Sequence, residues 1–135
     1  MSVIVTDTGF ATDNWPGPIH PLEEASATAE AVDVMPDTDP ASLAERIPAL
    51  RLVRVHFPSF ADGRGFTIAR QLRLMGYAGC LRATGHVIAD QYSMARRAGF
   101  DEVEIDEDLA ARQPEDQWLF RADWRRHDYQ ARLRG

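Results

Sequence analysis

The sequence predicts an α/β protein whose small parallel sheet is built from a βαβαβ unit, with a C-terminal helix docked on it. Three observations predict this class. The chain of 135 residues is long enough for one domain with its own core. Two apolar helical stretches each end in a glycine followed by an aromatic residue, at Gly76-Tyr77 and at Gly99-Phe100. A β-type run precedes the first helix and follows each of these exits, which is the order of successive βα units.

The N-terminal part of the chain is predicted to be weakly ordered. Residues 1–40 are acidic and rich in proline, and residues 13–40 show no sustained hydrophobic period. The β-branched run from Val3 to Val5 is compatible with a short strand. Residues 41–135 are expected to form the single α/β domain.

The regular elements of this domain follow from its hydrophobic pattern. Short runs of apolar, β-forming residues predict strands, and apolar residues at i, i+4 and i+7 predict helices. The predicted strands cover residues 52–57, 79–83 and 102–105. The predicted helices cover residues 66–75 and 88–98.

Two further helices are predicted at the ends of the domain. Asp39 and Pro40 are typical of a helix start, and they predict a short helix over residues 41–50 that Pro48 makes irregular. The tail contains too many aromatic residues for a solvated segment. A terminal helix over about residues 114–127 is therefore expected to pack on the sheet. The aromatic residues are Trp118, Phe120, Trp124 and Tyr129.

The charges of the chain fall into three blocks. Residues 1–45 hold nine acidic and no basic side chains, residues 46–97 hold nine arginines and two acids, and residues 98–135 hold ten acids and six arginines. A basic middle segment favours an anionic ligand or an acidic partner surface. The alternative is that the acidic flanks fold against the middle segment and neutralise it.

Loops that follow the carboxyl ends of parallel strands meet at one rim of the sheet, where ligands usually bind. The first such loop places glycines on both sides of Arg64 directly before a helix, so that backbone amides and a guanidinium can hold an anion. The alternative is a tight turn in which Asp62 caps the helix. The candidate anion-binding residues of the first and second loops are Asp62, Gly63, Arg64, Gly65, His86, Asp90 and Gln91.

Other polar residues give weaker signals. His86, Asp90 and Asp106 can be combined into a metal site or an acid/base pair, but their spacing does not require one, and no metal is expected. Cys80, the single cysteine, is interpreted as a buried small hydrophobe, and one cysteine favours the reducing cytoplasm. His56, in the middle of a strand, is interpreted as structural. No catalytic residue is predicted.

Several function classes have no motif in this sequence. It contains no dinucleotide fingerprint, no cysteine-rich iron–sulfur pattern and no flavin motif, so no cofactor is expected. No apolar run approaches the roughly 20 residues that span a bilayer, so a membrane is not an expected partner. The pI of 5.1, with arginines that are not interleaved with aromatic residues, argues against nucleic acid.

Residues 57–73, with the sequence FPSFADGRGFTIARQLR, resemble the bacterial domain-of-unknown-function family 934. The resemblance spans about residues 52–105. It continues through Gly76-Tyr77, Gly79, Leu81-Arg82-Ala83, Gly85-His86-Val87, Asp90-Gln91 and Arg97-Ala98-Gly99-Phe100-Asp101. It implies an association with the genes of sulfite reductase and of sulfate assimilation, and an oxidoreductase label that no cofactor motif in this chain supports.

Two functions are compatible with these observations. The first is an auxiliary factor in assimilatory sulfite or sulfate reduction that acts with a partner enzyme, such as sulfite reductase. The second is a small anion-binding enzyme or sensor with a sulfate- or phosphate-type pocket around Arg64. A homodimer is the alternative to a pathway partner, because open sheet edges pair readily. Whether the protein is an enzyme stays open.

Overall fold

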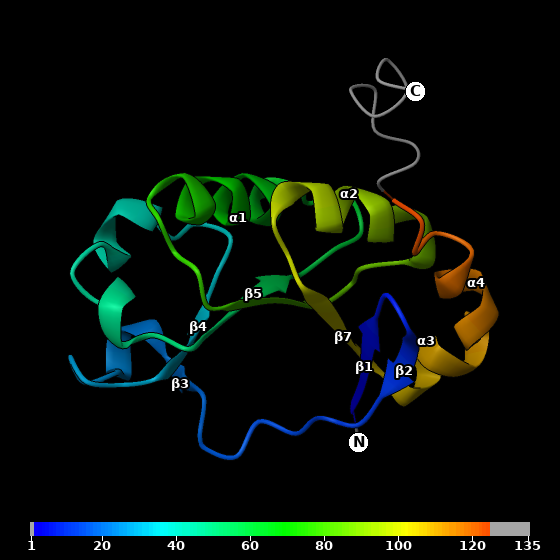
Figure 1. The fold of residues 1–135 in the computed structure, drawn as a ribbon, viewed down its shortest axis with the longest axis horizontal. Helices are drawn as coiled ribbons and strands as arrows, with labels where there is room; N and C mark the ends of the chain where they lie inside the picture. Colours follow the sequence, from blue (N-terminus) through cyan, green and yellow to red (C-terminus); the bar gives the residue numbers. More distant parts are fainter. Residues whose placement is uncertain (1, 125–135) are drawn as a thin grey trace.

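The computed structural model describes residues 2–124, which fold around one seven-stranded sheet (Figure 1). The strands lie in the order β2-β1-β7-β6-β5-β4-β3. Their bounds are β1 Ser2–Thr6, β2 Gly9–Ala11, β3 His20–Pro21, β4 Ala31–Val34, β5 Leu52–Phe57, β6 Cys80–Gly85 and β7 Glu102–Asp106. Strands β3 to β7 are parallel, and β1 pairs antiparallel with both β7 and β2.

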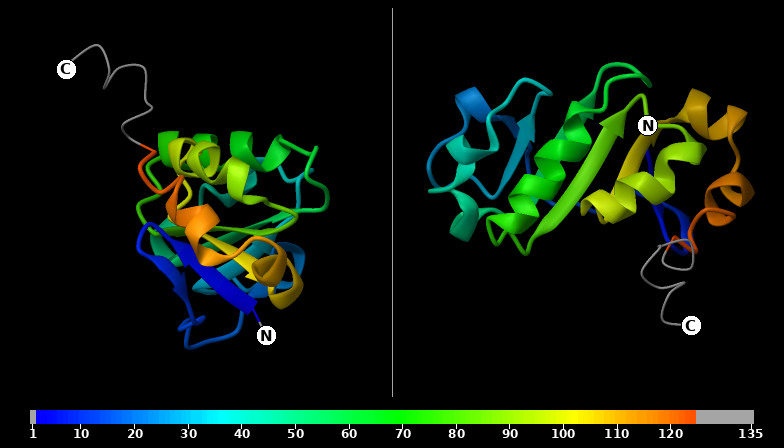
Figure 2. Two further views of the ribbon diagram at one scale, coloured as in Figure 1. Left: turned by 90° about the vertical axis from the view of Figure 1, so that its right-hand side faces the viewer. Right: turned by 90° about the horizontal axis from the view of Figure 1, so that it is seen from above.

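The α-helices of the described residues lie at two places. The α-helices are α1 (Arg64–Leu74), α2 (Tyr92–Ala98), α3 (Glu107–Arg112) and α4 (Glu115–Leu119). The short 3₁₀ turns are η1 (Leu22–Glu24), η2 (Pro40–Leu43), η3 (Ile47–Ala49) and η4 (Ala89–Gln91). Helices α1 and α2 lie side by side across one face of the parallel strands, whereas α3 and α4 lie beside β1 and β2 (Figures 1 and 2). Among residues 2–124 no α-helix lies on the opposite face of the sheet (Figure 1).

The order of the parallel strands explains why the long helices gather on one face. Each of the strands β4 to β7 lies next to the strand that precedes it in the chain, so every connection steps in the same direction. Connections between parallel strands have one hand, and connections of one hand that step in one direction pass over the same face. A doubly wound sheet reverses its strand order, which places helices on both faces and opens a crevice for ligands. The parallel strands described here have no such reversal.

The core lies between the sheet and α1 and α2. Alternate residues of the three central strands point toward the helices, namely Val53, Val55, Phe57, Leu81, Ala83, Val103 and Ile105. Helix α1 buries Ile68, Ala69 and Leu72 against them, and α2 buries Tyr92 and Ala95. The apolar stripe that the sequence shows at helical spacing is therefore the face that packs on the sheet.

The α/β class and a mostly parallel sheet are confirmed. Strands β5, β6 and β7 coincide closely with the three predicted strands. The two predicted exits also have the expected geometry: Gly76 and Gly99 have φ of +96° and +120°, a region that favours glycine, and Tyr77 and Phe100 behind them are buried. The predicted sheet is too small, however, because β1 to β4 join it from residues 2–40, which were expected to be weakly ordered.

The predicted flanking helices also differ from the structure. The helix predicted over residues 41–50 is instead the two turns η2 and η3, because Pro48 interrupts the hydrogen bonding that a continuous helix needs. The terminal helix predicted over residues 114–127 is the five-residue α4, and α3 precedes it unexpectedly. Helix α4 packs beside the edge strand β2, where Glu115 Oε2 accepts a hydrogen bond from the Phe10 N–H (2.8 Å). Residues 125–127 and Tyr129 lie outside the described residues.

None of the helices within residues 2–124 combines the length and the apolar character that a membrane crossing needs.

Candidate functional site

The loop before α1 pairs its own charges. The Asp62 carboxylate accepts hydrogen bonds from the Arg64 N–H (3.1 Å) and from Arg64 Nε (3.0 Å) and Nη2 (2.7 Å). The Arg64 side chain is nevertheless 60% exposed. Its hydrogen bonds lower the pKa of Asp62, and this carboxylate together with Asp37 raises the pKa of Arg64. The Arg64 guanidinium is thus already paired with a carboxylate of its own loop, that of Asp62.

The two glycines of this loop have different surroundings. A Cβ on Gly65 would lie 2.5 Å from Cζ of Phe57, so this glycine allows α1 to pack directly on β5. Gly63 precedes the first residue of α1 and has open space around it, with Phe66 Cδ2 nearest at 3.9 Å. The close approach at Gly65 explains the residue by packing. Whether the loop amides bind an anion stays a prediction.

The residues of the second loop separate into two groups. The Gln91 side chain donates to the Phe60 carbonyl (2.9 Å) and accepts from the Ile88 N–H (3.1 Å), so it ties the two loops together. The His86 ring contacts the Phe60 ring edge-on, with centroids 5.0 Å apart. Asp90 instead forms an ion pair with Arg121, beyond α4. The structure therefore brings His86 and Gln91 together around Phe60, and Asp90 has a separate partner.

A small cavity of about 170 Å³ lies at the carboxyl ends of β6 and β7. Its lining residues are Ser2, Phe60, Thr84, Gly85, His86, Glu104, Ile105, Asp106, Leu109 and Arg112. His86 and Asp106 are thus brought to one cavity, but the Asp106 carboxylate also caps α3 by accepting from the Leu109 N–H (2.7 Å). Glu104, which lines this cavity, also belongs to a larger set of charged residues on the face of the sheet opposite α1 and α2.

We call this set the charged face, and it consists of Asp13, Asp33, Arg54, His56, Arg82, Glu102 and Glu104. The strand register places Asp33, Arg54, Arg82 and Glu102 next to one another on four successive strands. Each of these positions alternates with a core residue, so all four side chains point away from α1 and α2. The charged face is therefore a row of charges laid across the parallel strands.

Every guanidinium in this row is paired. Arg54 donates to Asp33 through Nε (2.6 Å) and Nη2 (2.9 Å), and Arg82 donates to Glu102 through Nε (2.7 Å). The two arginines are cross-strand neighbours, where like charges repel. Glu104 offsets this repulsion, because Oε1 accepts from Nη1 of both Arg54 (3.1 Å) and Arg82 (2.9 Å).

Two further residues extend the row. His56 Nε2 lies 2.9 Å from Asp33 Oδ1, and the His56 side chain is 35% exposed. Asp13, in the segment between β2 and β3 that passes along this side of the sheet, pairs with Arg82 Nη1 (3.2 Å) (Figure 1). With these partners around it, the Arg82 side chain is only 3% exposed.

Burial and ion pairing have opposite effects on the pKa values of this row. Burial alone would raise the pKa of Asp33, but hydrogen bonds from His56 and Arg54 outweigh it, so the pKa of Asp33 is lowered. The hydrogen bond to Asp33 is the main reason that the pKa of Arg54 is raised. For Arg82 burial lowers the pKa, yet Glu102 and Asp13 raise it further than burial lowers it. Asp33, Arg54 and Arg82 are therefore held in their charged forms at neutral pH.

The three charge blocks of the sequence neutralise one another in the fold. Acidic residues of the N-terminal block pair with arginines of the middle block: Asp7 with Arg96, Asp13 with Arg82, Glu30 with Arg51, and Asp33 with Arg54. The C-terminal block adds Asp101 to Arg73, Glu102 to Arg82, and Glu104 to Arg54 and Arg82. These pairs favour the alternative in which the flanks neutralise the middle. On the charged face itself, the four carboxylates exceed the two guanidinium groups.

Comparison with known proteins gives one match. A family of bacterial proteins of unknown function, DUF934, matches residues 31–135. The chain belongs to this family. No curated protein and no solved structure matches the chain. The DUF934 region includes both rim loops and all of the charged face except Asp13.

Reasoning from the sequence missed the charged face, although the signal is present. Strand β5 reads Leu-Val-Arg-Val-His-Phe, and β7 reads Glu-Val-Glu-Ile-Asp, so charged and apolar residues alternate. Such alternation indicates a strand with one buried face and one polar face. His56, interpreted from the sequence as a structural residue, belongs to this polar face. Within residues 2–124, no three His, Cys, Asp or Glu residues form a group that could hold a metal ion.

Proposed function

We propose that this DUF934 protein is an accessory factor that binds a partner protein through its charged face. The observation that carries the proposal is the one-sided covering of the parallel strands. Parallel sheets are almost always covered on both faces, because their connections supply a layer to each. Here α1 and α2 cover one face, and no α-helix among residues 2–124 covers the opposite face, which carries Arg54, His56, Arg82 and Glu104. Only the segment between β2 and β3 passes along it, where Asp13 pairs with the buried Arg82 (Figure 1). A partner protein would supply the second layer.

The charges of this face define the partner's chemistry. Asp13, Asp33, Glu102 and Glu104 exceed the two arginines, so the face has a surplus of negative charge whenever His56 is neutral. A complementary partner surface carries lysine or arginine, and such complementarity speeds association and selects among partners. Two copies of this chain meeting face to face would bring like charges together. The face therefore favours a different protein over a second copy.

The association of DUF934 members with sulfite reductase genes, which the sequence resemblance implies, suggests the identity of this partner. We propose that the partner is sulfite reductase or another enzyme of sulfate assimilation, and that the two act in the cytoplasm. In this proposal the DUF934 protein carries no redox chemistry of its own. Its part is to hold or orient the enzyme that does.

The test is direct binding to purified sulfite reductase. Asp13→Asn combined with Glu102→Gln removes the surplus negative charge with side chains of the same shape. Both carboxylates are partners of the buried Arg82, so urea unfolding must first show that the variant is folded. We expect this variant to bind at least about tenfold more weakly than wild type, and wild-type binding to weaken with added salt. Glu23→Gln combined with Glu45→Gln removes the same charge away from the face and should bind like wild type. If the enzyme does not bind, or if both double variants bind alike, the proposal is wrong.

The second candidate is the anion-binding enzyme or sensor with a pocket around Arg64. One observation favours it: the guanidinium is largely exposed at the start of the eleven-residue helix α1. The internal pair with Asp62 weakens the case, because an incoming sulfate or phosphate must compete with this carboxylate. His86 would not contribute to this pocket, since its ring packs on Phe60 beside the cavity at β6 and β7.

A further inference from the structure

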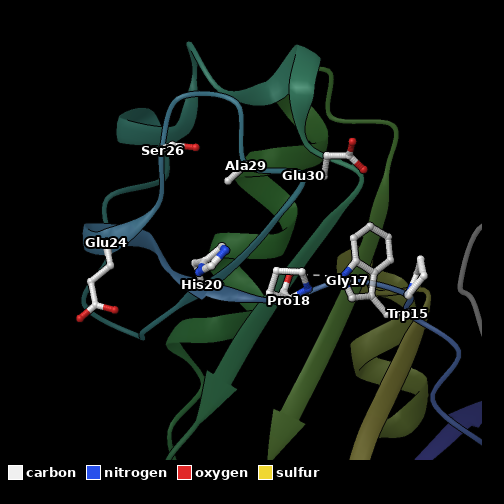
Figure 3. Close-up of a pocket in the computed structure, with 9 residues that line it drawn as sticks. Trp15, Gly17, Pro18, His20, Glu24, Ser26, Ala29 and Glu30 are labelled. Carbon is white, nitrogen blue, oxygen red and sulfur yellow. Dashed lines mark hydrogen bonds between the residues drawn. The ribbon is translucent and has the colours of Figure 1, made fainter.

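A second, larger cavity lies far from the rim of the sheet, at the side of β3. Its volume is about 420 Å³, within the range of small-molecule sites. The lining residues are Trp15, Pro16, Gly17, Pro18, His20, Glu24, Ser26, Ala29 and Glu30. Figure 3 shows that two segments enclose it: residues 15–18 with β3 form one wall, and residues 24–30 form the other. None of the lining residues lies in the region that DUF934 matches.

The walls of this cavity combine an aromatic and apolar surface with carboxylates. Trp15 and the prolines supply the apolar part, and the Trp15 indole is held in place by a hydrogen bond from Nε1 to the Pro18 carbonyl (3.4 Å). Glu30 lies near Trp15 at one end, and Glu24 lies at the other end with its carboxylate pointing away from the cavity (Figure 3). Lysine and arginine are absent from the lining. An aromatic face beside a carboxylate, as at Trp15 and Glu30, is the arrangement that attracts an organic cation.

A side chain of the protein itself shows that this chemistry operates here. The Arg51 guanidinium lies 5.5 Å from the centroid of the Trp15 ring and 3.2 Å from Glu30 Oε2. The Arg51 and Glu30 side chains are both well exposed, so solvent screens the pair and the arginine is displaceable. Trp15 and Glu30 thus already receive one planar cation from outside the cavity.

We propose that the 420 Å³ cavity is a binding site for a small organic cation, in which an amine or guanidine is attached to a flat apolar body. The body packs against Trp15 and Pro18, and the cation lies at Glu30, where it competes with Arg51. The cavity shares no residue with the charged face or the rim loops. The two regions are adjacent, because the Trp15 N–H donates a hydrogen bond to Asp13 Oδ1 (3.0 Å).

Three probes with one ring and different charges test the proposal by calorimetry on the full chain. These are 2-phenylethylamine, 2-phenylethanol and 3-phenylpropionate. We expect saturable binding of the amine and at least about tenfold weaker binding of the alcohol and the acid. Equal binding of all three, or no binding of the amine, would overturn the proposal.

Variants then locate the site. Trp15→Ala and Glu30→Gln should each weaken amine binding about fivefold or more. Arg51→Ala should strengthen it about threefold, because it removes the internal competitor. The backbone bonds of Arg51, from its N–H to the Glu30 carbonyl (2.7 Å) and to its carbonyl from the Cys80 N–H (2.9 Å), stay intact in this variant.

Arg70→Ala, on the outer surface of α1, removes the same charge elsewhere and is the control, with no expected change. Amine binding that is unchanged in Glu30→Gln, or that weakens in Arg51→Ala, would place the amine elsewhere and overturn the proposal.

Discussion

The two faces of the sheet are made from alternate residues of the same strands, but different forces stabilise them. On β6, Leu81 points toward α1 and α2 and Arg82 points away, and both are almost fully buried. Burial of the apolar Leu81 side chain stabilises the fold through the hydrophobic effect, and this contribution depends little on pH or salt. Arg82 leaves water at a cost, and only its carboxylate partners offset that cost. One face is therefore insensitive to protonation, whereas the other depends on it.

This difference bears on function. A buried set of ion pairs adds little net stability compared with apolar residues of the same size. The helix-covered face already provides the core of the fold, so the charged face is not needed for stability alone. The proposed recognition of a charged partner would give a reason to keep Arg54, Arg82 and Glu104 where apolar residues would pack as well.

The largest effect is expected from Arg82→Met. The substitution leaves Glu102, Glu104 and Asp13 without their shared partner in a nearly closed environment, and it should lower the free energy of unfolding by about 3–5 kcal/mol at neutral pH. Urea unfolding measures the loss. The loss should shrink in acid, where the carboxylates become protonated. A loss that is the same at all pH values would mean that Arg82 acts only by packing.

The neighbouring substitution on the opposite face gives the contrast. Leu81→Ala should cost about 3 kcal/mol, because it opens a cavity in a fully buried site, and this loss should not vary with pH. Leu74→Ala on α1 is the matched control, since Leu74 is 80% exposed and should change stability little. The free energy of unfolding of Leu81→Ala and of Arg82→Met is measured across the same pH range. If the two losses varied with pH in the same way, the two faces would not differ in their dependence on protonation.

A smaller and purely pH-dependent effect is expected at Asp33. Its pKa in the folded protein lies below the ordinary value of 3.8, so its stabilising contribution is present above that pH and is lost as the pH falls through the lower folded value. Asp33→Asn removes charge-assisted hydrogen bonds and should cost about 1.5–3 kcal/mol at neutral pH. The wild type should then approach the variant in stability below pH 3.8. If the difference in stability between wild type and Asp33→Asn stayed the same in acid, the ion pairing of Asp33 would be contradicted.

The smallest effect on stability is expected at Arg64, which belongs to neither face. Arg64→Ala should leave Tm nearly unchanged, because the pair with Asp62 is exposed to solvent. If the second candidate function is right, the same change should weaken sulfate binding at least about tenfold, whereas Asp62→Asn should strengthen it by freeing the guanidinium. Wild-type protein that binds no sulfate or phosphate would exclude an anion pocket here.

The parts of the fold that local pattern determines could be predicted from the sequence. The apolar stripe of α1, the glycine exits at Gly76 and Gly99, and strands β5 to β7 are examples. Strand β4 was not predicted because it has only four residues, lies among prolines and acidic residues, and contains Asp33. The role of Asp33 depends on its pairing with Arg54, 21 residues away. Pairing over such a distance produces no local hydrophobic pattern from which it could be predicted.

The candidate site shows the same limit. The hydrogen bond from the Arg64 N–H to Asp62 is a local interaction, and a tight turn here was foreseen as an alternative. The predicted cap residue is wrong, because the N-cap of α1 is Gly63 and not Asp62. The bridge from Glu104 to both Arg54 and Arg82 requires the strand order, which sequence alone does not provide. Likewise, the insertion of β1 antiparallel beside β7 joins residues about a hundred positions apart, so the prediction of a short strand at residues 3–5 could not place it.

The two ends of the sheet have a consequence for how molecules of this protein meet. Strand addition and fibril growth need a long outer strand with free backbone groups. At one end β3 has two residues, and Pro21 has no N–H to offer. At the other end β2 has three residues, and the carboxylate of Glu115 takes up the Phe10 N–H. Neither edge strand offers a row of free backbone groups to another chain, so the sheet is protected from aggregation by edge-strand pairing.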